Sequence, residues 1–437
     1  MNCQKVHEYI ESNRENIVKY LSDMISFPSI NHTQEGGNEK DVQDWLEASL
    51  KGFDFDVVDK FAVDPDGVRP NVCAKIKGTG GGKSLLFNGH MDVVPVGKPE
   101  IWCCDPFKPV VKDGKVFGRG SSDMKGGITA AIWALKALKD CGVKLRGDVI
   151  LQAATGEESQ QAEDIGTVKC LERGYTADFA IVCEPTDMEI HITSSALFFF
   201  ELQIEGKAVH TSARNQAVFP QPYGVPSGKD VAVDAFKKSL IFVDYFYRLE
   251  EELNHRYRDP VLGAGGNPRR DKQGIGIFTI NPSDIKGGVY LGSVPSYVRY
   301  MYCVWYPDQL VKKEVLFEEI KAGVAALAST DEFLRETPPK LTIPTLQNWS
   351  GFKVDRDHPG VQTLASAVQN VSGSEAVISG FRAVCDVSYI NEYGIPCIIY
   401  GPGSLANAVH GDDEFIAVEE VIEAAKVYAQ MIMQWCE

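Results

Sequence analysis

The sequence predicts an α/β fold, in which a mostly parallel sheet is covered by helices on both faces and a second, α+β domain is inserted. Three observations support this. Uninterrupted apolar segments at residues 83–87, 148–154, 177–183 and 396–400 have the composition of strands buried on both faces. Segments with helical periodicity separate them. The middle of the chain instead follows the order strand, helix, strand, strand, helix, strand of a ferredoxin-like unit.

The first elements are two amphipathic helices. Residues 6–25 and 39–50 both place apolar side chains at helical spacing. A strand is predicted at residues 71–77. The glycine-rich linker 78–82 that follows resembles the end of a phosphate-binding loop, but Lys77 stands where the first glycine is required and a strand follows instead of a helix. We therefore interpret this linker as a hairpin turn.

The later elements complete two domains. A helix at residues 126–139 and a closing helix at 418–435 belong to the parallel-sheet domain. The expected inserted elements are strands 197–204, 274–280, 297–305 and 340–344, helices 229–253 and 311–327, and loops 216–228 and 263–272. The predicted domains are therefore 1–194 with 353–437, and an inserted domain at 195–352.

Length, charge and cysteine content exclude several classes of protein. A chain of 437 residues is too long for one ordinary core. Its net charge of −16 repels nucleic-acid phosphates and anionic lipid. The first thirty residues lack the apolar segment of a signal peptide, and the apolar run 196–200 is too short to span a bilayer. Eleven cysteines without a C-x-x-C pair favour a cytoplasmic location.

Side chains that can bind metal ions stand at strand ends and sharp turns. They are His90, Asp123, Glu157, Glu158, Glu184 and His410. Because the carboxyl ends of parallel strands meet at one edge of a sheet, we expect these groups to converge. Imidazoles and carboxylates suit a pair of divalent ions such as zinc, cobalt or manganese, and one bridging Asp completes a two-metal hydrolytic arrangement.

Each of these residues, taken singly, also fits a structural role. His90 fits a polar residue at a strand end, Glu184 before Pro185 fits the start of a turn, and His410 fits an acidic surface loop. Their joint occurrence after several strands favours ligation. The adjacent Glu157 and Glu158 strengthen this interpretation, because neighbouring side chains diverge and one can bind metal while the other acts as a base.

Five motifs occur in a fixed order along the chain. They are Gly89-His90-Met91-Asp92-Val93-Val94-Pro95, Gly118-Arg119-Gly120 with Asp123-Met124-Lys125-Gly126-Gly127, Gly156-Glu157-Glu158, Glu184-Pro185, and Gly401-Pro402-Gly403 with His410 and Glu414. In this order they resemble the family of zinc aminoacylases, acetylornithine deacetylases, succinyl-diaminopimelate desuccinylases and glutamate-releasing carboxypeptidases. The resemblance implies a zinc-exopeptidase-like α/β/α catalytic domain with an inserted ferredoxin-like lid and dimerisation domain.

The resemblance also implies the metal ligands. His90, Asp123 and Glu184 would hold one divalent ion, and Asp123, Glu158 and His410 would hold the other. Zinc is the expected metal, with cobalt or manganese as alternatives.

Three further residues receive catalytic roles from the resemblance. Asp92 would steady His90, as carboxylates behind a metal ligand do. Glu157 would act as the general base on a metal-bridged water and pass the proton to the leaving amine. His210 would reach the partner's site in a homodimer and donate to the developing oxyanion; the alternative is a histidine near the end of an exposed strand.

One departure from the family bears on the substrate. The positions of a substrate-gripping Asn and Arg of that family fall on Gly292 and Trp305. Arg382 is the candidate replacement for the missing Arg, with a plain surface residue as the alternative. This departure argues against a simple N-acyl amino acid as the substrate.

The sequence therefore predicts metal-dependent hydrolysis of a linear amide. N-deacylation of a small N-acyl amine or amino acid is the leading chemistry, and cleavage of dipeptides or of a C-terminal residue is the alternative. A non-catalytic ligand-binding relative is disfavoured because Glu157 and all the ligand-type residues are present. A two-metal phosphoesterase is disfavoured because the motifs lack a basic cluster to hold phosphate.

Overall fold

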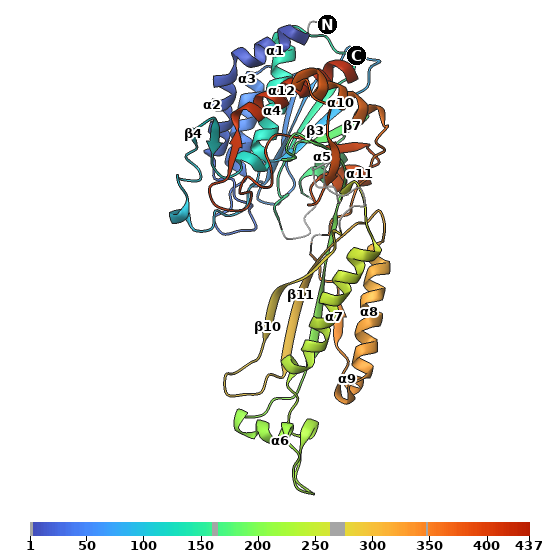
Figure 1. Cartoon of the computed structure of the whole chain (residues 1–437). Coiled ribbons are helices and arrows are strands. Elements are labelled where there is room, and N and C mark those ends of the chain that lie inside the picture. Colours follow the sequence, from blue (N-terminus) through green and yellow to red (C-terminus); the bar gives the residue numbers. More distant parts are fainter. Residues whose placement is uncertain (1–2, 160–164, 263–275, 347) are drawn as a thin grey trace. The chain divides into compact units, whose positions relative to one another are not determined.

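The computed structural model describes residues 3–159, 165–262, 276–346 and 348–437 (Figure 1). These residues form two compact units. The first combines the segments Met1–Ser194 and Phe352–Glu437, and the second takes the described residues between Ser195 and Gly351. The predicted loop at 263–272 lies outside the described residues.

An eight-stranded sheet organises the first unit, in the order β1-β2-β6-β3-β7-β14-β8-β13. Its strands are β1 (Val57–Ala62), β2 (Pro70–Ile76), β3 (Leu85–His90), β6 (Val149–Ala154), β7 (Phe179–Val182), β8 (Ile190–Ser194), β13 (Ile378–Phe381) and β14 (Cys397–Ile399). The central neighbours β6, β3, β7 and β14 are parallel. Every residue of these four strands is buried, which explains their mostly apolar character and confirms the predicted α/β class.

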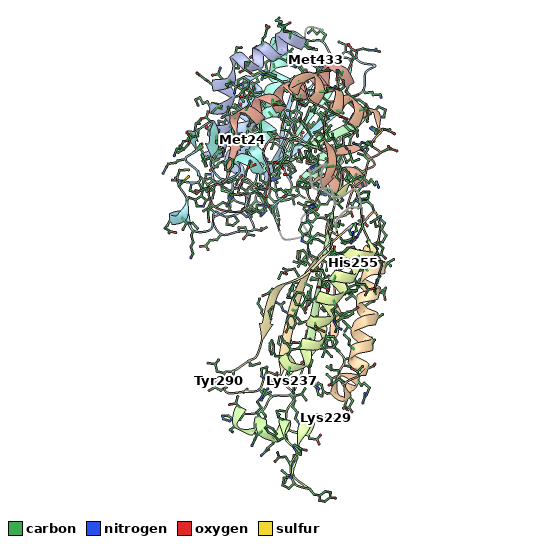
Figure 2. The ribbon with its side chains drawn as sticks, viewed as in Figure 1. Met24, Lys229, Lys237, His255, Tyr290 and Met433 are labelled. Atoms are coloured by element: carbon green, nitrogen blue, oxygen red, sulfur yellow. The ribbon has the colours of Figure 1, made fainter. Side chains whose placement is uncertain are left out.

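Helices cover this sheet. They are α1 (Cys3–Ser12), α2 (Arg14–Ile25), α3 (Lys40–Gly52), α4 (Gly126–Asp140), α5 (Thr167–Glu172), α10 (Pro359–Ser372), α11 (Val387–Glu392) and α12 (Val418–Trp435). Helices α4 and α12 pack against each other (Figure 1). Met24 of α2 and Met433 of α12, labelled in Figure 2, are both buried in the core of this unit. A small sheet of β15 (Phe415–Ala417), β5 (Lys115–Phe117) and β4 (Val110–Lys112) completes the unit.

The first predicted helix is divided at Asn13. Residues 6–25 were expected to form one helix, but α1 ends at Ser12 and α2 begins at Arg14. The Asn13 side-chain amide donates to the Tyr9 carbonyl at 2.9 Å. Asparagine competes in this way with the backbone hydrogen bonds of a helix, and the apolar periodicity continues across the break.

The predicted hairpin turn at residues 78–82 is wrong. Strands β2 and β3 do not pair, because β6 lies between them in the sheet. The linker passes around the start of β6, where the Gly78 amide donates to the Asp148 carboxylate and the Gly80 amide donates to the Arg146 carbonyl. The exclusion of a phosphate-binding loop holds, since the linker leads into a strand.

The second unit is an antiparallel sheet in the order β10-β11-β9-β12, with helices packed on it (Figure 1). Its elements are β9 (Ala196–Glu205), α6 (Arg214–Val218), α7 (Ala235–Arg256), β10 (Thr279–Gly287), β11 (Tyr297–Tyr306), α8 (Lys313–Ser329), α9 (Glu332–Glu336) and β12 (Lys340–Thr342). Burial alternates along β9 and β11, as it does in a sheet with one covered face. The ferredoxin-like order is confirmed.

The largest differences from the predicted boundaries in this unit are at α7 and β10. Helix α7 begins at Ala235 instead of 229, because the Asp234 side chain accepts from the Lys237 amide and caps the helix there. Strand β10 begins at Thr279 and continues to Gly287, beyond the predicted end at residue 280. Residues 274 and 275 of that predicted strand lie outside the described residues.

Two further properties concern the whole chain. Among the described residues, no helix combines the length and the apolar character needed to cross a bilayer. All eleven cysteines are free thiols.

Candidate metal centre

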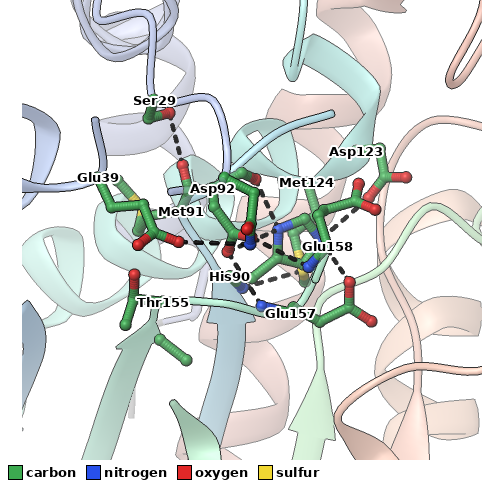
Figure 3. Close-up of polar contacts among 12 residues, drawn as sticks. Ser29, Glu39, His90, Met91, Asp92, Asp123, Met124, Thr155, Glu157 and Glu158 are labelled. Atoms are coloured by element: carbon green, nitrogen blue, oxygen red, sulfur yellow. Dashed lines mark hydrogen bonds and ion pairs between the residues drawn. The ribbon is translucent and has the colours of Figure 1, made fainter. Parts of the chain in front are cut away.

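Three parallel strands deliver acidic and imidazole side chains to the same edge of the sheet. Strand β3 ends at His90, β6 leads into Glu157 and Glu158, and β7 leads into Glu184. These strands are direct neighbours in the order β6-β3-β7, so their carboxyl ends lie together. Figure 3 shows His90, Asp92, Asp123 and Glu158 gathered at this edge.

Two loops bring the remaining residues to this edge. Asp123 lies in the segment Ser121–Lys125, between the left-handed Gly120 (φ 83°) and helix α4, and the peptide bond to Met124 is cis. His410 lies in the loop that follows β14. Gly401, at the start of that loop, packs so closely on β7 that an added Cβ would lie 2.6 Å from the Glu184 carbonyl oxygen.

Asp123 lies between the two predicted histidine ligands. His90 Nε2 lies 3.1 Å from Asp123 Oδ1 and 3.7 Å from Glu184 Oε1. His410 Nε2 lies 3.5 Å from Asp123 Oδ2 and 3.0 Å from Glu158 Oε1. The two oxygens of one carboxylate therefore face two different imidazoles, which is the arrangement of a carboxylate shared between two ions.

The donor set fits two divalent ions. The groups His90–Asp123–Glu184 and Asp123–Glu158–His410 each place their ligand atoms within 4.8 Å of one another. Ligand atoms about 2.0–2.1 Å from a tetrahedral ion lie roughly 3.4 Å apart. The separations here are close to that value, so each group can close on an ion with small side-chain movements.

The charges point to the same conclusion. Burial raises the pKa values of Glu157 and Glu184 well above the usual range. Hydrogen bonds to Asp123 and Glu158 raise the pKa of His410 to about 10. Burial opposes the charged form of Asp123, but the hydrogen bonds from His410 and His90 bring its pKa below the usual value. Buried acids that compete for two imidazoles form a site that favours added cations.

Asp92 contacts His90 and also fixes the turn that carries Glu157 and Glu158. Its main-chain carbonyl accepts from His90 Nδ1 at 2.8 Å, whereas its carboxylate lies 3.8 Å from that nitrogen. The carboxylate instead accepts from the amides of Glu157 at 3.2 Å and Glu158 at 3.0 Å. Asp92 thus ties the end of β3 to the turn after β6, and so connects a candidate metal ligand with the candidate base.

Behind Asp92 lies a buried polar network that the sequence analysis missed. Asn31 Nδ2 donates to Asp92 Oδ2 at 2.7 Å and to Glu39 Oε1 at 3.4 Å. Glu39, which lies beside Asp92 in Figure 3, is completely buried and pairs with the Arg69 guanidinium. Burial and the Asp92 charge raise the pKa of Glu39 to about 7, against the opposing effect of Arg69. Sequence spacing gives no signal for these contacts, since their members are far apart in the chain.

A second buried pair, Arg119 with Glu414, lies beside Asp123. Both residues belong to the quoted motifs, but the sequence analysis gave neither a role. The sequence signal that could have singled out Arg119 is a charged side chain between two glycines, as at Gly118-Arg119-Gly120. Asp386 is also buried near the site, with its carboxylate hydrogen-bonded to Thr167 Oγ1 at 2.6 Å.

Four other residues of the sequence analysis are not part of the ligand cluster. His210 lies in the second unit, bridged to Ser293, with Nδ1 2.8 Å from Ser212 Oγ. Trp305 is half-buried in β11 of that unit, opposite Leu197 of β9. Gly292 precedes β11 and accepts from the Thr211 amide. Arg382 is exposed, directly after β13 in the first unit.

Comparison with known proteins places this geometry in context. The family model "Peptidase family M20/M25/M40" matches residues 86–434. The chain is 31% identical to the N-formyl-4-amino-5-aminomethyl-2-methylpyrimidine deformylase of Bacillus subtilis, in an alignment that covers 98% of this chain and 96% of the relative. It is 28% identical to a probable succinyl-diaminopimelate desuccinylase of Staphylococcus epidermidis, with 96% and 98% covered.

Solved structures share the fold at lower identity. Human carnosine dipeptidase 1 matches with a TM-score of 0.71 and 15% identity, covering 100% of this chain and 99% of that one. The metallo-carboxypeptidase Sso-CP2 of Sulfolobus solfataricus matches with a TM-score of 0.70 and 19% identity, covering 96% and 99%. At this identity, the likeness concerns the fold alone.

Proposed function

The chain belongs to peptidase family M20/M25/M40. From that premise we propose that it removes a small acyl group from an N-acyl amine, with formyl as the leading candidate. It is an enzyme that hydrolyses amide bonds. The observation that carries the proposal is the position of Asp123, whose two carboxylate oxygens face His90 and His410. We propose two divalent ions at this position, zinc in first place and cobalt or manganese as alternatives.

The proposed chemistry follows from the donor groups. Bound there, two divalent ions polarise an amide carbonyl and lower the pKa of water. Glu157, whose Oε2 lies 4.0 Å from His90 Nε2, is the candidate base that takes the proton from the attacking water. It then passes this proton to the leaving amine nitrogen. Glu158 is hydrogen-bonded to His410 and is assigned to metal binding.

Two observations support an amine without an α-carboxylate as the leaving group. The first is the 31% identity, over nearly the whole chain, to a deformylase named for an aminomethylpyrimidine. The second is Trp305, which stands where the resembling family has an Arg that grips the substrate. An indole offers an aromatic ring a stacking surface and offers a carboxylate no counter-charge.

A substrate panel tests this proposal. The purified chain, loaded with zinc or cobalt, is assayed on N-formyl-4-amino-5-aminomethyl-2-methylpyrimidine, N-formylbenzylamine, N-acetyl and N-succinyl amino acids, and dipeptides. We expect the highest kcat/KM on the formylated aminomethyl ring compounds. A preference for dipeptides would establish the alternative peptidase activity. No turnover on any compound, with both ions bound, would refute the proposal.

Two further features are proposed, the first from the family resemblance and the second from the cysteines. We propose a homodimer formed through the inserted unit, in which His210 serves the partner's site; light scattering that finds only monomers would exclude it. We also propose a cytoplasmic location, because the eleven cysteines are free and a reducing compartment keeps them so. Cell fractionation that recovers the chain outside the cytoplasm would contradict this.

A further inference from the structure

We propose that the buried ion pair of Arg119 and Glu414 is a positioning device, which ties Asp123 to the loop of His410 and thereby sets the affinity for one of the two ions. This ion is the one assigned to Asp123, Glu158 and His410. The inference rests on the two-ion site of the proposed function. Neither side chain is among the candidate metal ligands, so both would act through the residues that they hold.

Glu414 fixes the backbone around Asp123. Its side chain is 1% exposed, and the two carboxylate oxygens accept from three main-chain amides. Oε2 accepts from Gly120 at 3.0 Å, and Oε1 accepts from Ser122 at 2.9 Å and Asp123 at 3.1 Å. A buried carboxylate in such a ring of amides orients the whole turn, and therefore the shared ligand at its end.

Arg119 extends this hold to the His410 loop. Its Nη1 donates to Glu414 Oε2 at 2.8 Å, and its Nη2 donates to the carbonyls of Gly411 at 2.9 Å and Pro95 at 3.3 Å. Gly411 directly follows His410 in the chain. The planar guanidinium, which lies over the Trp102 ring, thus joins the two segments that carry Asp123 and His410.

The His410 loop needs such a restraint. Ala408, His410 and Asp413 all have left-handed backbone angles, with φ values of 57°, 61° and 60°. Residues other than glycine rarely adopt this conformation, and it persists where surrounding contacts enforce it. The His410 side chain is 54% exposed, so core packing does not hold it in place. Without Arg119, the loop would relax and carry its imidazole away from Asp123.

The other ion is held by different contacts. His90 ends a fully buried strand, and its Nδ1 is bonded to the Asp92 carbonyl. Glu184 follows β7 and packs under Gly401. Although Asp123 serves both ions, loss of the Arg119–Glu414 pair should therefore weaken the binding of the His410 ion more than that of the other ion, whereas a general loss of structure would weaken both equally.

The main test uses a charge-neutral double variant, Arg119→Met with Glu414→Gln. Removing both charges avoids leaving one unpaired in the interior, and the amide side chain introduced by Glu414→Gln retains an oxygen for the main-chain amides. We expect a folded protein that binds the ion assigned to Asp123, Glu158 and His410 about 10–100-fold more weakly, with a smaller loss of affinity for the other ion. Zinc per chain is measured by plasma mass spectrometry after dialysis, and both affinities are measured by calorimetric titration.

Four further variants decide between positioning and plain stability. Arg119→Lys keeps the charge, but the lysine cannot reach both Glu414 and Gly411. It should therefore also weaken the binding of the His410 ion. His410→Ala should weaken the binding of its ion less in the double variant than in the wild type, whereas His90→Ala should release the other ion. Leu364→Ala in α10 removes a fully buried side chain away from the loop and should leave both ions bound despite its lower melting temperature.

The outcomes separate this inference from the proposed function. Wild-type protein that binds no ion would remove the two-ion site itself. Wild-type and double-variant proteins that both bind two ions at the same affinity would overturn only the positioning role. Equal loss of both ions in the double variant, or loss of an ion in Leu364→Ala, would show a stability effect and would overturn it as well.

Discussion

At the scale of single residues, Glu157 and Glu158 show how two neighbouring carboxylates can receive different tasks. Both amides donate to the Asp92 carboxylate, which fixes the turn. Glu158 Oε1 is then bonded to His410 at 3.0 Å, whereas the nearest imidazole nitrogen to Glu157 Oε2 is at 4.0 Å. Glu158 is therefore engaged by the ligand cluster, and Glu157 remains the candidate carboxylate for exchanging a proton with substrate.

Changing Glu157→Gln should separate these tasks. Glutamine keeps the shape of the side chain but cannot accept a proton, so we expect kcat to fall about 10²–10⁴-fold. Metal content should remain at the wild-type value. The matched control is Glu158→Gln, which should lower metal content because it alters a ligand. If Glu157→Gln retains normal turnover, or releases an ion, the assignment of the base is wrong.

The residues recovered from sequence and those missed differ in one physical respect. His90, Glu157, Glu158 and Glu184 follow buried strands, and a strand end can be recognised from local sequence. Arg119 and Glu414 are 295 positions apart, and no local sequence pattern indicates that they form an ion pair. The same holds for Asn31 and Asp92, which are 61 positions apart.

At the scale of secondary-structure elements, helix α3 contributes an unusual buried carboxyl at its start. Glu39 precedes Lys40, the first residue of α3, and burial and the Asp92 charge raise its pKa to about 7. The folded state therefore keeps a proton that the unfolded state has released between about pH 4.5 and pH 7. This contribution to stability is complete below the unfolded pKa and is lost as the pH rises through about 7.

The Glu39→Gln variant should remove this pH dependence. We expect the stability of wild-type protein relative to the variant to fall by up to about 3 kcal/mol between pH 4.5 and pH 7.5. Urea unfolding of the metal-free proteins at several pH values measures the difference, and other carboxyl groups cancel in the comparison. If pairing with Arg69 dominates instead, the relative stability will rise with pH, and the proposed direction is refuted.

The contact between α4 and β7 provides a second prediction at this scale. A Cβ added to Gly127 would lie 2.0 Å from the Cys183 carbonyl oxygen, directly before Glu184. Gly127→Ala should therefore push the backbone of a ligand segment, lowering the free energy of unfolding by about 1–3 kcal/mol and weakening metal binding. Calorimetric melting and zinc titration measure both effects.

Gly52 is the matched control for this substitution. It is the last residue of α3, and a Cβ added there would meet nothing within 4 Å. Gly52→Ala should leave metal binding unchanged and should be neutral or stabilising by up to about 1 kcal/mol. Equal behaviour of the two glycine variants would show that the close approach of α4 to β7 has no energetic consequence.

The elements themselves could be predicted to different degrees. Buried strands such as β6 and β7 are mostly apolar and were found, whereas β1 is only partly buried at every position and was missed. The false hairpin at 78–82 has a different cause. The chain order of β2 and β3 suggested pairing, and only the long-range insertion of β6 between them excludes it.

At the scale of the whole molecule, the second unit has its own buried core between its sheet and helices α7 and α8. Its ferredoxin-like order was visible in the sequence because each element is long and regular. Hydrophobic periodicity does not indicate the function of this unit. The proposed dimer and the proposed role of His210 come from the family resemblance alone. These two points are therefore tested together.

Complementation between two inactive variants provides that test. Glu157→Gln lacks the base, and His210→Ala lacks the imidazole proposed to serve the partner's site. In a mixed dimer, the site with an intact Glu157 receives His210 from the other subunit, so one of the two sites is complete. Random assortment makes roughly half of the dimers mixed, and co-expression should restore roughly a quarter of wild-type activity.

The contrasting result is equally clear. If His210 acts within its own chain, every mixed dimer contains one site without the base and one without the imidazole, and activity stays at the level of the single variants. Each single variant must first bind two ions and sediment as a dimer, so that lost assembly is not mistaken for lost catalysis. His255→Ala, at the far end of α7 from Asp234, is the control histidine and should remain active without a partner.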